Sequence, residues 1–137
     1  MQHLPRVRDM MNADTFAVHA TDEVTAAIDV LIDRAVTGVP VLDPEDRLVG
    51  MITEADCLAL LTRGDADAKP VHGTVEQVLG KPFHTVAPEM DIYYVAGLFN
   101  KYPMERRFAV LEDGALLGVI TRKDVLRGVR ILLEAAR

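Results

Sequence analysis

Cysteine and long apolar runs are scarce in this chain of 137 residues, and each scarcity excludes a class of protein. The single cysteine, Cys57, cannot form an internal disulfide, which fits a reducing cytoplasm and not a disulfide-stabilised secreted domain. No run approaches the roughly 20 apolar residues of a membrane-spanning helix, and the first residues lack the pattern of a secretory signal. We therefore expect a cytoplasmic protein with no membrane partner.

Basic residues are outnumbered as well. The chain has 15 Lys and Arg against 21 Asp and Glu, which gives a formal net charge of −6. A protein of this charge is repelled by phosphate backbones, so we expect no general nucleic-acid surface. Hydrophobic residues make up 50% of the chain, which is enough for one compact domain with its own core.

What the chain does contain is an internal repeat. Residues 48–56 (LVGMITEAD) return as residues 116–124 (LLGVITRKD), so that Gly50 and Gly118 are 68 positions apart. In each copy an apolar run rich in branched residues, typical of a buried strand, meets Thr-x-x-Asp and then an apolar helical pattern. A period of half the chain indicates one structural unit used twice, with a strand–helix junction as the duplicated element.

Both repeats predict the same order of elements, strand–helix–strand–strand–helix, and hence an α/β fold. Short strands are expected at residues 15–18 and 83–86, and short lead-in helices at 4–11 and 75–79. The last helix is expected to run from Asp124 to about Ala136. We place repeat 1 at residues 5–62, a polar linker at 63–74, repeat 2 at 75–130, and the end of the last helix at 131–137.

Further segments accompany the junctions in a fixed order: VRDMM at 7–11, GVPVLD at 38–43 and RRFAVL at 106–111. Together with the duplication, they resemble a tandem pair of cystathionine-β-synthase (CBS) domains, the arrangement called a Bateman module. This resemblance implies two pseudo-twofold-related α/β units packed sheet to sheet, with clefts between the repeats that bind AMP, ADP, ATP or S-adenosylmethionine. It also implies a homodimer with a regulatory role. Ala109, in the place that Pro40 has in repeat 1, and a longer loop at 101–105 depart from the pattern.

Two interpretations fit Thr53-x-x-Asp56 and Thr121-x-x-Asp124. Both are capping boxes, a pattern that by itself only begins a helix. In an open cleft, the Asp carboxylate accepts hydrogen bonds from both hydroxyls of a ribose. The Thr hydroxyl and the free amides of the helix start then meet a phosphate.

The two junctions differ in charge. Glu54 in the first repels a phosphate, whereas Arg122 and Lys123 in the second attract one, and Arg106 and Arg107 enter the strand before it. We therefore expect the second junction to be the better phosphate site, and the first either to bind more weakly or to prefer an uncharged adenosyl group. The alternative is that these cations are solvated surface charges.

The remaining candidates are apolar walls for an adenine ring and glycines that let a ligand approach the backbone. Plain core packing also explains the walls, because strands this apolar are buried in any case. The wall candidates are Val18, Val39, Pro40, Val41, Val86, Phe108, Ala109 and Val110, and the glycines are Gly50 and Gly118. No catalytic or metal-binding residue is expected, because the sequence lacks a nucleophile–base pair, metal-ligand spacing and a P-loop.

Two functions of different classes follow. The first is a sensor that binds an adenine nucleotide or another adenosyl ligand, requires no cofactor, and signals to an unknown effector protein by changed packing or association. The second is a ligand-independent dimerisation or interaction module in which both Thr-x-x-Asp motifs are only helix caps. The Asp in both repeats favours the sensor, and we do not expect an enzyme.

Overall fold

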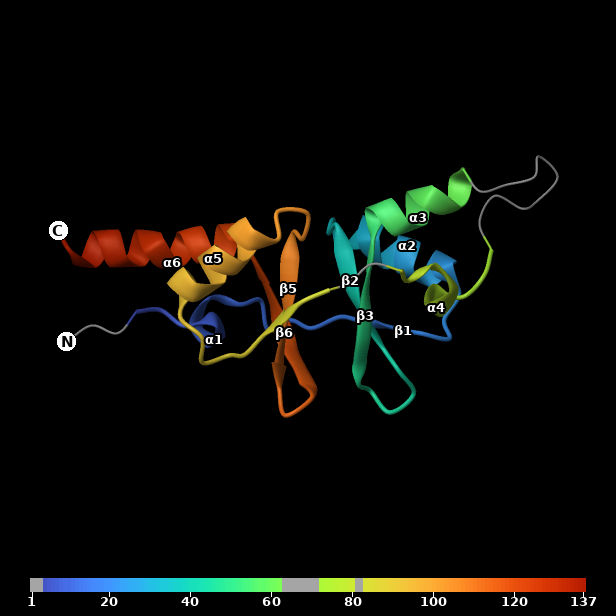
Figure 1. The fold of residues 1–137 in the computed structure, drawn as a ribbon, viewed down its shortest axis with the longest axis horizontal. Coiled ribbons are helices and arrows are strands. Elements are labelled where there is room, and N and C mark those ends of the chain that lie inside the picture. Colours follow the sequence, from blue (N-terminus) through green and yellow to red (C-terminus); the bar gives the residue numbers. More distant parts are fainter. Residues whose placement is uncertain (1–3, 63–71, 81–82) are drawn as a thin grey trace. The chain divides into compact units, whose positions relative to one another are not determined.

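The apolar pattern of each repeat folds into a three-stranded sheet with helices against it (Figure 1). The computed structural model describes residues 4–62, 72–80 and 83–137, and among these no helix has both the length and the apolar character to cross a membrane. The first-repeat unit, Phe16–Phe83, contains β1 (Val18–His19), α2 (Val24–Asp33), β2 (Gly38–Leu42), β3 (Leu48–Thr53), α3 (Glu54–Leu61) and α4 (Val75–Val78). The second-repeat unit, residues 4–15 with 84–137, contains α1 (Val7–Met10), β4 (Thr85–Val86), α5 (Ile92–Lys101), β5 (Arg107–Glu112), β6 (Ala115–Thr121) and α6 (Arg122–Ala135).

The two sheets have the same strand order. β1 runs parallel to β2 and β2 antiparallel to β3, and β4, β5 and β6 repeat this arrangement. The predicted strand–helix–strand–strand–helix order and the α/β class are thus confirmed. The register places each junction threonine opposite the first residue of the neighbouring strand, so that Thr53 pairs with Gly38 and Thr121 pairs with Arg107.

Each unit has its own apolar core, because alternate strand residues point to the same sheet face and meet the apolar sides of the helices. In the first-repeat unit the core includes Val18, Val39, Val41 and Ile52 from the strands, with Val24, Ala27 and Leu31 from α2. In the second-repeat unit it includes Val86, Phe108, Val110 and Ile120 from the strands, with Ile92, Val95 and Phe99 from α5 and Val125 from α6.

The lead-in segments pack with the other repeat. Val7 of α1 is fully buried in the core of the second-repeat unit, and its backbone N donates to Met90 O at 2.8 Å. Asn12 then forms a β-bridge with Val119. In the same way Val75 of α4 is buried in the first-repeat unit. The compact units therefore differ from the sequence repeats at their starts, and residues 63–71 of the expected linker lie outside the described residues.

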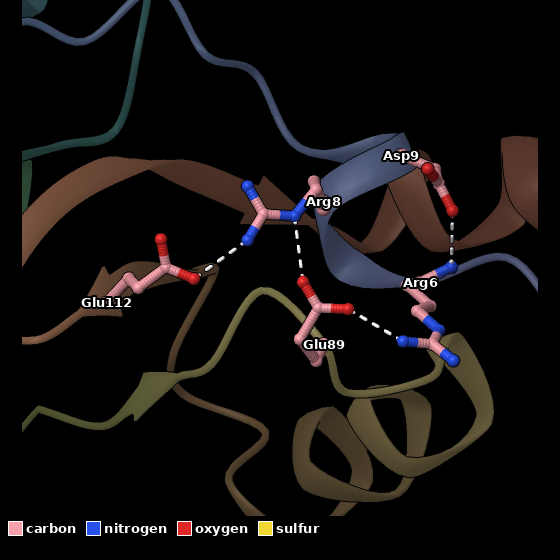
Figure 2. A network of polar contacts seen from close by, with 5 residues as sticks. All are labelled: Arg6, Arg8, Asp9, Glu89 and Glu112. Carbon is pink, nitrogen blue, oxygen red and sulfur yellow. Dashed lines mark hydrogen bonds and ion pairs between the residues drawn. The ribbon is translucent and has the colours of Figure 1, made fainter.

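A network of charged side chains joins α1 to the rest of the second-repeat unit (Figure 2). Arg6 Nη1 lies 2.7 Å from Glu89 Oε2, and Arg8 lies 2.8 Å from both Glu89 Oε1 and Glu112 Oε2. Asp9 Oδ2 accepts a hydrogen bond from the backbone N of Arg6 at 3.0 Å. The hydrogen bonds from Arg6 and Arg8 lower the pKa of Glu89, and the hydrogen bond to Glu89 is the main cause that raises the pKa of Arg8. All these side chains are solvent-exposed, so salt screens the network.

Candidate functional site

The two strand–helix junctions have the same local geometry. Thr53 and Thr121 are the N-cap residues of α3 and α6, each with extended backbone (φ −116°). Thr53 N donates to Asp56 Oδ2 at 2.9 Å, and Asp56 N donates to Thr53 Oγ1 at 3.2 Å. The corresponding distances for Thr121 and Asp124 are 2.9 and 3.3 Å. Both motifs are thus complete capping boxes, because each satisfies two backbone donors that a helix start leaves unpaired.

The carboxylates of these caps are buried. Asp56 is 8% exposed and Asp124 is 9% exposed, and no other polar or charged residue in the described part of the chain is buried to this degree. Backbone hydrogen bonds and the positive end of the helix dipole offset the cost of burying them ionised. Each cap uses only the Oδ2 atom of its Asp, so the Oδ1 atom is the one that remains for a hydrogen bond to another group.

The two Oδ1 atoms have different surroundings. Asp124 Oδ1 accepts a hydrogen bond from Arg127 Nη1 at 2.7 Å, one turn along α6. Asp56 Oδ1 has no hydrogen-bond or ion-pair partner among the described residues, and the residue 68 positions before Arg127 is Ala59. The sequence prediction did not include Arg127, although acid and base at i and i+3 on a helix are the spacing at which such pairs form.

Arg122, predicted as a phosphate contact, holds the end of α5 in this structure. Its guanidinium donates to Glu105 O at 2.8 Å, Pro103 O at 3.2 Å and Phe99 O at 3.3 Å, and it lies 4.7 Å from the centre of the Phe99 ring. Carbonyl groups after a helix end need donors, and a guanidinium supplies several in one plane. Arg122 would have to leave these acceptors in order to bind a ligand.

The other predicted cations lie around the second junction. Lys123 is exposed at the first turn of α6, and Arg106 is exposed just before β5. Arg107 is partly buried and pairs across the sheet with Thr121, where the first-repeat unit has Gly38 opposite Thr53. The second junction therefore carries positive charge that has no counterpart at the first.

The predicted adenine walls divide between the two faces of each sheet. Val18, Val39, Val41, Val86, Phe108 and Val110 are members of the cores beneath the helices. Pro40 and Ala109 lie at the alternate positions of β2 and β5, opposite Met51 and Val119, on the sheet face turned away from those cores. Pro40 and Ala109 are nevertheless fully buried, and the other wall candidates are buried too, so none of these side chains is exposed to solvent in this structure.

The chain itself approaches the backbone at both predicted glycines. A Cβ at Gly118 would lie 2.3 Å from Asn12 O, because Asn12 bridges the edge of β6 there. A Cβ at Gly50 would lie 2.9 Å from Leu79 Cδ1. The lead-in residues thus fill the space that a Cβ would take at both glycines, and the expectation that a ligand approaches the backbone there stays a prediction.

Two further groups lie near the sites. Burial, and secondarily the charge of Asp56, raise the pKa of the Cys57 thiol, so Cys57 is a protonated core residue as predicted and not a reactive thiolate. The His84 ring contacts the Glu105 carboxylate and stacks on Tyr102 at 3.7 Å between ring centres, contacts that the sequence did not indicate. Among the described residues no three His, Cys, Asp or Glu side chains are grouped so as to hold a metal ion.

Comparison with known proteins identifies the fold and the repeat. Relatives include the A-adding tRNA nucleotidyltransferase of Aquifex aeolicus, which is 29% identical over 129 residues, 94% of this chain but only 15% of that protein. Hypoxic response protein 1 of Mycobacterium tuberculosis is 26% identical over 121 residues, which are 88% of this chain and 82% of that protein. The chain spans only 15% to 24% of the first four curated relatives that it matches.

Solved structures agree. CBSX2 in complex with AMP superposes with a TM-score of 0.78 at 26% identity, covering 93% of this chain and 97% of that one. The AcuB protein of Vibrio cholerae, at 22% identity, shares the fold with a TM-score of 0.82 over 96% of this chain and 95% of that one. The sequence profile of the CBS domain matches residues 7–63 and again 75–131. This chain therefore belongs to the CBS domain family and carries two CBS domains in tandem.

Proposed function

We propose that this chain is a non-catalytic regulatory module that binds an adenosyl ligand at its Thr-x-x-Asp junctions and passes the signal to an effector protein. The observation that carries the proposal is the buried Asp56 at the start of α3. Its Oδ2 completes the cap, while its Oδ1 has no partner among the described residues. An ionised oxygen in this position is an acceptor for ribose hydroxyls. The AMP complex of CBSX2, similar over 93% of this chain, supports an adenosyl group as the ligand.

The charge around each junction suggests which adenosyl ligand it prefers. Glu54 and Asp56 make the first junction acidic, whereas Lys123, Arg106 and Arg107 surround the second with positive charge. A phosphate is attracted by the cations at the second junction and repelled by the carboxylates at the first. We therefore propose AMP, ADP or ATP for the second junction and an uncharged or cationic adenosyl group, such as that of S-adenosylmethionine, for the first.

A second function has its own support. Both caps are complete without any ligand, and exposed apolar side chains lie along α3 and α6: Leu58, Leu61, Leu126, Ile131 and Leu133, each 51% to 64% exposed. Apolar surface of this kind is buried when proteins associate. An interaction module that forms a homodimer or docks onto a partner without a ligand is thus the alternative, and a sensor that dimerises through these residues combines the two.

Isothermal titration calorimetry with AMP, ATP, S-adenosylmethionine and adenosine tests the sensor. Asp56→Asn and Asp124→Asn are the informative variants, because the amide oxygen keeps the cap to the Thr backbone N while the second carboxylate oxygen is lost. Asp91→Asn is the matched control. Asp91 caps a different helix, α5, where its Oδ1 accepts a hydrogen bond from Tyr94 N at 2.9 Å. Binding that the junction variants abolish and Asp91→Asn retains supports the sensor. A folded protein that binds none of the four ligands supports the interaction module.

A further inference from the structure

The two junctions share their caps but differ in the side chains along the helix that follows. In α6 the positions after Thr121 include four cations, three of them exposed, whereas the positions 68 residues earlier carry an acid or small neutral side chains. The second-repeat residues are Arg122, Lys123, Arg127 and Arg130, and their first-repeat counterparts are Glu54, Ala55, Ala59 and Thr62.

Arg127 is the one of these four cations that contacts the buried carboxylate. Its Nη1 lies 2.7 Å from Asp124 Oδ1, and its side chain is 55% exposed while that of Asp124 is 12% exposed. The guanidinium thus extends from solvent to the one oxygen of Asp124 that the cap leaves open. Since arginine has donors only and stays charged at all ordinary pH values, it competes with any hydroxyl that donates to this oxygen.

An open hollow of about 270 Å³ lies beside this ion pair, lined by Lys123, Leu126, Arg127 and Arg130. Neither Lys123 nor Arg130 has an ion-pair partner among the described residues. Three cations around one hollow form an environment for a multiply charged anion such as a phosphate.

We propose that Arg127 is the specificity-determining residue of the second junction, which makes binding there depend on a phosphate on the ligand. This rests on the proposed adenosyl site at Thr121 and Asp124. A nucleoside must displace the guanidinium from Asp124 and offers it no other anion. A nucleotide places its phosphate in the hollow. Arg127 then pairs with the phosphate in place of the Asp124 carboxylate, and a ribose hydroxyl donates to Asp124 Oδ1. At the first junction, where Ala59 stands in this place, no such requirement exists.

The test compares AMP with adenosine by calorimetry in an Asp56→Asn background, so that the heat comes from the second junction. Arg127→Ala should weaken AMP binding about tenfold, equivalent to about 1.4 kcal/mol, and should strengthen adenosine binding several-fold. The reciprocal variant Ala59→Arg, made with Asp124→Asn, should weaken adenosine binding at the first junction more than AMP binding. Arg47→Ala, which removes an exposed charge from the β2–β3 turn, is the control for net charge.

The opposite signs for the two ligands separate this role from a structural one. If Arg127→Ala weakens both ligands in parallel or changes neither, Arg127 does not set specificity, and the adenosyl site stands without it. If the Asp56→Asn protein binds neither ligand, whether Arg127 is kept or replaced by alanine, the proposed site at the second junction fails and this inference fails with it.

Discussion

Replacing Gly118 with alanine should destabilise the second-repeat unit strongly, because the space of the new methyl group is already taken by backbone. A Cβ at this position would lie 2.3 Å from Asn12 O and 3.1 Å from Asn12 C. Backbone atoms cannot rotate away as a side chain does, so the lead-in segment must move off β6. That movement breaks two hydrogen bonds between Asn12 and Val119, of 2.9 and 3.1 Å.

The expected loss of unfolding free energy is about 3 kcal/mol, from two hydrogen bonds at about 1 kcal/mol each and overpacking of at least about 1 kcal/mol. Gly50→Ala should cost less, about 1 kcal/mol, since its contact at 2.9 Å is the end of the Leu79 side chain, which can change rotamer. Gly97→Ala is the matched control. It lies in α5 with no atom within 4 Å of its Cβ position, and alanine there should stabilise by about 0.5–1 kcal/mol.

Urea unfolding followed by circular dichroism measures all three variants on one scale. From most to least stable, the order should be Gly97→Ala, wild type, Gly50→Ala and Gly118→Ala. If Gly118→Ala unfolds within about 0.5 kcal/mol of the wild type, the range of an ordinary surface substitution, then the contact between Asn12 and β6 does not constrain this position and the reasoning is refuted.

Three further predictions concern charged and titratable groups. Glu89→Gln should lower the free energy of unfolding at neutral pH and low salt. Because the pKa of Glu89 is lowered in the folded state, the loss relative to wild type is full above the ordinary value of 4.5, disappears as the pH falls through the lowered value, and shrinks in high salt. A loss that neither acid nor salt changes would contradict this. Arg122→Ala should lower the free energy of unfolding by about 2 kcal/mol in thermal or urea unfolding, because it removes the donor of three carbonyls at and after the end of α5. Lys123→Ala, at an exposed position, should have little effect. Equal effects of the two variants would mean that Arg122 is a solvated charge. Cys57 should react with iodoacetamide at pH 8 more slowly than free cysteine does, because burial and the charge of Asp56 raise the pKa of its thiol. Asp56→Asn removes that charge and should speed the reaction. A wild-type rate equal to that of free cysteine would contradict the burial of Cys57.

The local parts of both junctions could be predicted from sequence, because their hydrogen bonds join residues three positions apart. Thr53 with Asp56 and Thr121 with Asp124 form the expected capping boxes, and the apolar runs before them form the expected strands. The ion pair of Arg127 with Asp124 has the same short range and could have been found by the same logic. Whether the junctions bind a ligand is not a local property, and it stays a prediction.

What the sequence by itself determined is the repeat, the order of its elements and the helix caps, since these depend on residue periodicity and on hydrogen bonds within one turn. Only the tertiary structure decided the roles of residues whose partners lie far along the chain. Arg122 meets Phe99 and Glu105, Gly118 meets Asn12, and Arg8 meets Glu89 and Glu112. No periodicity marks such pairs, because the packing of each unit brings them together: the lead-in segments fill the cores that Val7 and Val75 complete.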